Sequence, residues 1–108
     1  MPKHKLTPVF HALGNPTRLA VFERLCLGPA SVSELADPFS MALPSFMQHL
    51  DVLEAAELVE SHKRGRVRTY RARPVPMLAM STWLESRRTE WEARLDQLDD
   101  YLESTWGT

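Results

Sequence analysis

Cysteine is nearly absent from this chain of 108 residues, in which Cys26 is the single copy. One cysteine excludes an internal disulfide framework and any cysteine-rich zinc site. No apolar run approaches the ~20 residues that a membrane-spanning helix needs. The N-terminal stretch MPKHKLTP has neither the apolar segment nor the cleavage site of a secretory signal. We therefore expect a soluble, cytoplasmic protein without a membrane partner.

Patterns for catalysis are missing as well. The chain has no discernible pairing of a nucleophile with a base, no paired-carboxylate site and no glycine loop to cradle a phosphate. It also lacks internal repeats, low-complexity tracts and a long linker. Its 44% of apolar and 25% of charged residues are ordinary for a folded domain. The sequence predicts one domain over residues 1–108, with no enzymatic activity and no cofactor.

The net charge is only −1, but it is distributed unevenly. Residues 1–57 carry a net charge of −2 and residues 74–108 a net charge of −4, whereas residues 58–73 carry +5. This concentration of basic side chains favours an anionic partner, and nucleic-acid phosphate is the obvious one. A solvated basic hairpin without a ligand explains the charge alone equally well.

Helical periodicity dominates the first half of the chain. Apolar residues in the range 6–13 recur at the spacing of one helical face, and Gly14 ends this helix. Asn15 followed by Pro16 is typical of an N-cap and a first turn, so a second helix begins there and stops before Gly28.

The second helix has a predicted apolar face that includes Leu19, Phe22, Leu25 and Cys26. On that face Cys26 would be buried and inert. Arg18, near the start of this helix, is interpreted as an intramolecular ion-pair partner rather than a DNA contact.

Two further helices follow. Ser31 and Glu34 have the spacing of a capping box, which predicts a short third helix ending near Asp37. A fourth helix, over residues 40–56, has Pro44 in its first turn. The apolar residues predicted to anchor this fourth helix are Phe46, Leu50 and Leu53.

The second half of the chain predicts a hairpin and a long helix. Residues 58–63 and 66–71 have the composition of two strands, with Arg64 and Gly65 at the turn. The last helix covers about residues 76–106. The expected fold is therefore mainly α with a small β-hairpin, in the order of four helices, two strands and a final helix.

This order is that of a winged helix-turn-helix. Residues 31–56 form the helix-turn-helix and the basic hairpin, about residues 58–73, forms the wing. A helix fits the major groove of B-DNA, so we expect helix 40–56 there. Wing residues 62–71 would meet the phosphate backbone or enter the minor groove.

Four segments also match one family of regulators. The chain resembles the ArsR/SmtB family of winged-helix repressors over nearly its whole length, and its last helix looks like that of a subgroup without metal sites. The resemblance implies a sequence-specific repressor of transcription. The matching segments are LGNPTRL (13–19), SELA (33–36), LPSFMQHLDVLE (43–54) and RGRVRTYR (64–71).

Departures from the family pattern also have consequences. Family metalloregulators bind metal through cysteines of the third helix or through Asp and His of the last, and this chain has neither the cysteines nor the histidine there. Ala42 replaces a usual capping serine, which should cost the fourth helix ~1 kcal/mol. Glu57 replaces a usual closing glycine, so strain is expected at that corner. Met47 replaces a frequent serine.

The predicted DNA contacts lie on the fourth helix and the wing. Gln48 is placed to read adenine, which is worth ~1–3 kcal/mol of discrimination, or is simply exposed. Ser45 bonds a phosphate or caps its own turn, and Met47 touches a thymine methyl or solvent. The family uses the position of His49 for both DNA contact and packing. The full predicted set is Ser45, Met47, Gln48, His49, Lys63, Arg64, Arg66 and Arg68.

A homodimer is predicted because the last helix has more apolar surface than one small winged domain covers. A two-fold dimer reads an inverted repeat whose half-sites are centred about one turn, ~10 bp, apart. A cavity between the long helices could hold an unknown small-molecule inducer. The predicted interface residues are Leu6, Phe10, Trp91, Leu95, Leu98 and Leu102.

Two alternatives stay open at this point. One is a metal- or thiol-responsive repressor that uses a site outside the family pattern, built on Cys26 or on His4 and His11. The other is a winged-helix module that binds protein rather than DNA.

Overall fold

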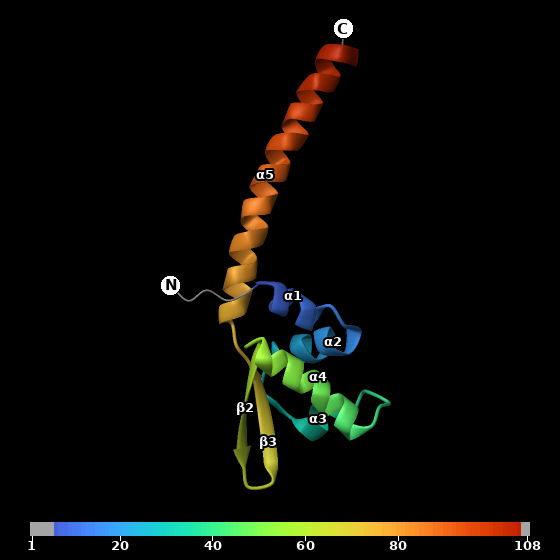
Figure 1. Ribbon diagram of the computed structural model, residues 1–108, viewed down its shortest axis with the longest axis vertical. Helices are drawn as coiled ribbons and strands as arrows, with labels where there is room; N and C mark the ends of the chain where they lie inside the picture. Colours follow the sequence, from blue (N-terminus) through green and yellow to red (C-terminus); the bar gives the residue numbers. More distant parts are fainter. Residues whose placement is uncertain (1–5, 107–108) are drawn as a thin grey trace.

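The computed structural model describes residues 6–106 and contains the predicted helices in the predicted order. A three-stranded antiparallel sheet lies beside them, with the strand order β1-β3-β2. The fold is the expected winged helix-turn-helix (Figure 1). Its elements are α1 (Leu6–Leu13), α2 (Pro16–Leu25), β1 (Ala30–Ser31), α3 (Val32–Ala36), α4 (Leu43–Ala55), β2 (Val59–Arg64), β3 (Val67–Ala72) and α5 (Val75–Trp106).

Strand β1 is an addition to the predicted hairpin. Its two residues pair with the middle of β3, Ala30 opposite Tyr70 and Ser31 opposite Thr69. A strand of two residues is too short to show an alternating pattern, so sequence periodicity could not reveal it. By this pairing, the start of the helix-turn-helix is hydrogen-bonded to the wing.

The wing turn lies one residue later than predicted. Arg64 and Val67 form the last pair of the hairpin, so Gly65 and Arg66 make the turn and Arg64 belongs to β2. Gly65 has a φ of +63°, a left-handed conformation that glycine adopts without steric cost. Arg66 thereby occupies the tip of the wing.

Of the two helices of the helix-turn-helix, α3 begins where the sequence predicts and α4 begins later. Ser31 and Glu34 form both hydrogen bonds of the capping box, so α3 begins as expected. Hydrogen bonds from the backbone and hydroxyl of Ser31 hold the pKa of the Glu34 carboxyl below its ordinary value. Helix α4 begins at Leu43 rather than at residue 40, because residues 37–42 form the turn.

The core lies where α1, α2, α4 and the sheet meet. Phe46, Leu50 and Leu53 of α4 are fully buried in it, as predicted. Tyr70 of β3 is also buried in this core, so the sheet packs against these helices. Because this side of α4 is buried, the opposite face of the helix is turned toward solvent.

The predicted face of α2 is wrong in part. Phe22 and Leu25 are buried together with Val21, but Leu19 is 43% exposed and Cys26 is exposed. Two neighbouring sets of residues in α2 have the spacing of one helical face. The set that is buried differs from the predicted set by a shift of about one residue. Cys26 lies beyond the last helical residue, as the C-cap of α2.

Helix α5 leaves this core and projects away from it (Figure 1). Its 32 residues correspond to a rod of ~48 Å, because an α-helix rises 1.5 Å per residue. Only Pro76 and Met80 of this helix are buried, both near its start. The molecule is accordingly elongated, with extents of 72 × 37 × 21 Å.

Candidate nucleic-acid interface

Helix α4 presents a polar face opposite its buried stripe. Ser45 and Gln48 are exposed, whereas Met47 and His49 are half-buried at the edges of this face. Met47 packs partly against the hydrophobic core, so the structure gives it a packing role besides the predicted contact. Asp51 is also exposed on α4 and adds a negative charge to this face.

The N-terminal end of α4 is anchored by an aromatic contact. Phe39, in the turn before the helix, lies 5.6 Å from Phe46, measured between ring centroids. Ala42 is the N-cap, and its side chain makes no capping hydrogen bond, as predicted. The turn is therefore held by apolar packing instead of by a cap.

The C-terminal end of α4 closes at Glu57. This residue has a φ of 61°, and it is the one non-glycine residue with positive φ in the range 6–106. Its backbone N–H donates to the Glu54 carbonyl at 2.9 Å, and that of Leu58 donates to the Leu53 carbonyl at 3.1 Å. This is the Schellman pattern, which usually has glycine at this position. The strain predicted for the corner is therefore present.

Apart from Arg68, the basic residues of the wing fall into two groups. At the base, Arg71 lies 3.3 Å from a Glu60 oxygen, and Arg73 lies 3.5 Å from a Glu57 oxygen. At the tip, Lys63, Arg64 and Arg66 are exposed and take part in none of the ion pairs between described residues. Positive charge that is free to meet an anion is therefore concentrated at the tip.

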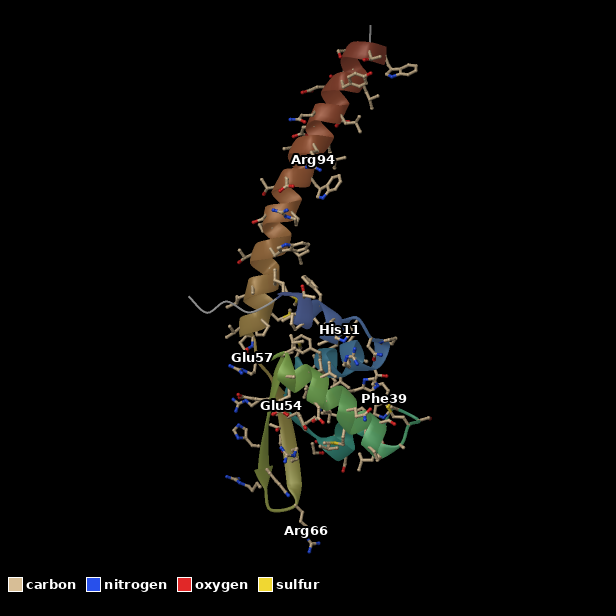
Figure 2. The ribbon with its side chains drawn as sticks, viewed as in Figure 1. His11, Phe39, Glu54, Glu57, Arg66 and Arg94 are labelled. Atoms are coloured by element: carbon tan, nitrogen blue, oxygen red, sulfur yellow. The ribbon has the colours of Figure 1, made fainter. Side chains whose placement is uncertain are left out.

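The three tip cations cover different directions. Lys63 pairs with Arg68 across the hairpin, so both belong to the face that also contains the buried Tyr70. Arg64 lies on the other face, and Arg66 points away from the body of the molecule (Figure 2). An elongated anion could touch this tip from more than one side.

Arg68 differs from the other predicted contacts of the wing because it is half-buried and hydrogen-bonded. Its Nη1 donates to Ser61 Oγ at 3.0 Å, and Ser61 Oγ donates to Glu54 Oε2 at 3.1 Å. These two hydrogen bonds join the wing to the C-terminal end of α4, where Figure 2 labels Glu54. Burial raises the pKa of the adjacent Tyr70 hydroxyl above its ordinary value, and the Glu54 carboxylate raises it further. Arg68 therefore orients the wing relative to α4.

Arg18 and His49 are also brought together, which sequence analysis missed. Arg18 was interpreted as an ion-pair partner, but its guanidinium donates to the Ala12 carbonyl at 2.7 Å and lies 3.1 Å from His49 Nδ1. The two residues are 31 positions apart. No local pattern encodes such a contact, because it depends on how α2 packs on α4.

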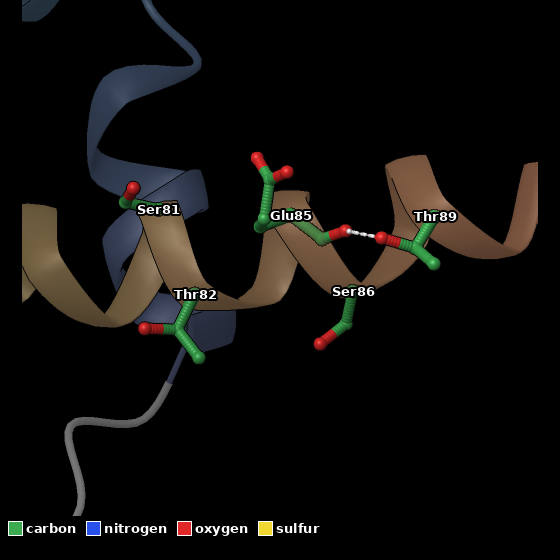
Figure 3. Close-up of a pocket in the computed structure, with 5 residues that line it drawn as sticks. All are labelled: Ser81, Thr82, Glu85, Ser86 and Thr89. Atoms are coloured by element: carbon green, nitrogen blue, oxygen red, sulfur yellow. Dashed lines mark hydrogen bonds between the residues drawn. The ribbon is translucent and has the colours of Figure 1, made fainter. Parts of the chain in front are cut away.

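A hollow on α5 differs from this surface, because a single helix forms it. Figure 3 shows a hollow on α5 in which the Thr89 hydroxyl donates to the Glu85 carbonyl at 3.1 Å. All of its lining residues belong to this one helix, so no second element closes it. Within residues 6–106 no three His, Cys, Asp or Glu side chains are grouped to hold a metal, and His4 lies outside that range. No helix in the described range is long and apolar enough to cross a membrane.

The fold and this surface define a winged-helix transcriptional regulator that binds DNA, and comparisons with known proteins agree. A family model described as a helix-turn-helix domain matches residues 13–62. The HTH-type transcriptional regulator Rv2034 of Mycobacterium tuberculosis is 40% identical over 76 residues, covering 70% of this chain and 71% of that relative. The transcriptional repressor SdpR of Bacillus subtilis is 28% identical over 76 residues, covering 70% of this chain and 84% of that relative.

Solved structures place the chain in a family. A crystal structure of an ArsR family transcriptional regulator matches with a TM-score of 0.78 at 50% identity, covering 81% of this chain and 90% of that one. An ArsR-like transcriptional regulator from Rhodococcus sp. RHA1 matches with a TM-score of 0.73 at 33% identity, covering 89% and 91%. The chain belongs to the ArsR family of winged-helix transcriptional regulators. It is a DNA-binding regulator and not an enzyme.

Proposed function

We propose that this regulator is a homodimeric repressor that reads an inverted repeat and blocks a promoter. Helix α4 enters the major groove, and the wing tip meets the phosphate backbone or the minor groove. The observation that carries this proposal is the division of the wing charges, since the tip cations are exposed while those at the base are paired. Unpaired cations are the ones that release counterions from DNA when they bind.

Each predicted contact has a role in this proposal. Gln48, exposed on α4, reads a base edge, and Ser45 donates to a phosphate near the start of the helix. Met47 contributes at the edge of the groove while packing on the core. His49 binds the backbone. At the tip, phosphate contacts come from Lys63, Arg64 and Arg66, and Arg68 supports them from its internal hydrogen bonds.

The dimer is supported by the apolar side chains that α5 exposes. Trp91, Leu95, Leu98 and Leu102 are between 41% and 57% exposed, and their spacing of four, three and four residues is that of a coiled-coil seam. A second copy of the chain would cover this stripe and remove it from water.

The first helix extends this proposed dimer surface. Phe10 packs edge-on against Trp83, with ring centroids 5.5 Å apart, and remains 38% exposed. Leu6 lines an adjoining groove with α5 residues, including Leu78 and Trp83. We propose that the second copy of the chain occupies this groove. The unknown small-molecule inducer stays a prediction from the sequence.

Salt dependence of DNA binding tests the proposal. The affinity for a duplex from the DNA upstream of the chain's own gene is measured at several salt concentrations. Replacing Arg66 by Ala should reduce the slope of log affinity against log salt by ~1, because one phosphate contact is lost. Arg94→Ala, on α5 and far from the wing tip, is the matched control and should leave the slope unchanged (Figure 2).

Two results would count against the proposal. An Arg66→Ala protein with the wild-type slope would remove the wing from the interface. A footprint without two-fold symmetry on the same upstream DNA would contradict the inverted repeat.

A further inference from the structure

Arg18 lies in the first turn of α2, where the N-cap residue Asn15 holds its backbone. Asn15 is the N-cap, and its side-chain oxygen accepts hydrogen bonds from the backbone N–H groups of Thr17 at 2.9 Å and Arg18 at 3.1 Å. The N-cap satisfies donors that a helix start otherwise leaves unpaired. The backbone of Arg18, from which the side chain extends, is therefore held in place.

The guanidinium of Arg18 turns back onto the end of α1. Its Nε donates to the Ala12 carbonyl at 2.7 Å, and its Nη2 donates to the His11 carbonyl at 3.3 Å. These carbonyls belong to the last turn of α1, which forms the negative end of the helix dipole, and the His11 carbonyl also accepts from the Gly14 backbone N–H at 3.1 Å. Arg18 thus closes α1 with two hydrogen bonds and a positive charge.

The third nitrogen of the Arg18 guanidinium reaches helix α4. Its Nη1 lies 3.1 Å from Nδ1 of His49. A guanidinium has only donors, so Nδ1 of the imidazole must be the acceptor. The proton of the neutral ring therefore resides on Nε2, because the hydrogen bond at one ring nitrogen selects the tautomer.

The opposite nitrogen of His49 is available to a ligand. Within residues 6–106 no group accepts a hydrogen bond from Nε2, and no polar side-chain atom in that range is both sealed from solvent and without a partner. The Nε2–H group therefore reaches solvent. Ser45 lies one helical turn earlier on α4, on the same face, so two donors stand side by side.

We propose that Arg18 is a positioning residue for DNA binding, because it holds His49 as an Nε2–H donor to a DNA phosphate and ties α4 to the last turn of α1. The DNA-contacting residue is His49, and Arg18 acts through it. This inference rests on the proposed placement of α4 on DNA. It adds a neutral contact to the cationic ones of the wing, and it joins the recognition helix to a helix of the proposed dimer surface.

Substitutions that imitate each ring nitrogen test the two halves of this role. In His49→Gln the amide group extends to the position of Nε2, and in His49→Asn it ends near Nδ1. His49→Gln should retain wild-type affinity within about twofold, whereas His49→Asn should bind about fivefold more weakly, the effect of one lost hydrogen bond. Because the lost donor is neutral, the salt slope of His49→Asn should equal that of the wild type.

The tautomer of His49 gives a readout that does not involve DNA. Nitrogen NMR of the imidazole at mildly alkaline pH should show the Nε2–H form in the wild type. Arg18→Lys removes the forked geometry, so His49 should become a mixture of tautomers and DNA affinity should fall as in His49→Asn. His11→Asn is the matched control, because only the backbone carbonyl of His11 contacts Arg18, and it should change neither quantity.

The outcomes separate this inference from the proposed function. A wild-type His49 in the Nδ1–H form, or one whose tautomer is the same in Arg18→Lys, would overturn the positioning role. Equal affinity of His49→Asn and the wild type would overturn the phosphate contact. Either result leaves the Arg66→Ala salt slope as an independent test of the wing. Should Arg18→Lys fail to fold, the His49 variants alone decide the contact.

Discussion

Glu57 adopts a backbone conformation that a residue with a Cβ rarely accepts. Its φ of 61° is required because the chain must reverse direction between α4 and the buried Leu58. The left-handed conformation costs a non-glycine residue ~1–2 kcal/mol. Part of this cost is offset by Arg73, whose Nη1 lies 3.5 Å from the Glu57 carboxylate. Such exposed ion pairs contribute only ~0–1 kcal/mol.

Glu57→Gly is therefore expected to stabilise the protein. The free energy of unfolding should rise by ~0.5–1 kcal/mol, since relief of the backbone strain exceeds the loss of an exposed ion pair. Urea denaturation measures this change. Glu57→Ala is the control, because alanine loses the carboxylate and keeps the strain. A glycine variant no more stable than the alanine variant would contradict this account.

At single residues, local patterns in the sequence were reliable and distant contacts were not. The cap at Asn15 and the box of Ser31 with Glu34 are encoded within four residues, and the structure confirms them. The partners of Arg18 and Arg68 depend on the packing of separate elements, so only the charge of these residues was evident from the sequence. The exposure of Cys26 was mispredicted because helical spacing alone does not fix which of two neighbouring stripes is buried.

Among the elements, α4 begins without a side-chain cap. Ala42 has φ −64° and ψ 144°, the extended geometry of an N-cap, but alanine has no oxygen to accept the free N–H groups. Apolar contact between Phe39 and Phe46 holds the turn in its place. Helix α4 is therefore anchored by its core face and has no side-chain cap at the end that carries Ser45.

Replacing Ala42 by Ser should strengthen this start. A hydroxyl at the N-cap position typically contributes ~1 kcal/mol, so the thermal midpoint of unfolding should rise. Differential scanning calorimetry provides the measurement. Ala42→Val adds a side chain of similar bulk without an acceptor and should give no gain. Equal midpoints for the serine and valine variants would show that the cap is not formed.

The helices and strands of the hairpin could be predicted from the sequence, but the exact residues at which elements begin and end could not. The helices and the hairpin follow from periodicities of several residues, so the fold class was correct. Strand β1 has two residues and left no pattern, and the wing turn differs by one residue because both Arg64 and Arg66 flank Gly65 symmetrically. A shift of this size is important, because it places Arg66 at the tip.

On the scale of the whole molecule, α5 provides the apolar surface on which the proposed dimer rests. Its length was evident from the sequence, whereas its direction away from the core was not, because no pattern records where a helix points. Helix α5 projects away from the other elements (Figure 1), and its seam residues Trp91, Leu95, Leu98 and Leu102 are exposed. The described chain thus exposes apolar surface that water disfavours.

Charge placed in this seam should separate the proposed dimer. Leu95→Glu combined with Leu98→Glu would bring four carboxylates together in the apolar contact, so the protein should sediment as a monomer. Gln97→Glu adds a carboxylate on the outward side of α5 and should remain dimeric. Analytical ultracentrifugation distinguishes the species. A double variant of wild-type mass would place the interface elsewhere.

The segregation of charge along the long axis gives the molecule two electrical poles. The wing segment, residues 58–73, carries +5 and residues 74–108 carry −4, on a body that is 72 Å long. A polyanion therefore exerts a torque that turns the wing forward and the acidic rod outward before any contact forms. Collisions in the wrong orientation become rarer, and this benefit fades as salt shortens the reach of the field.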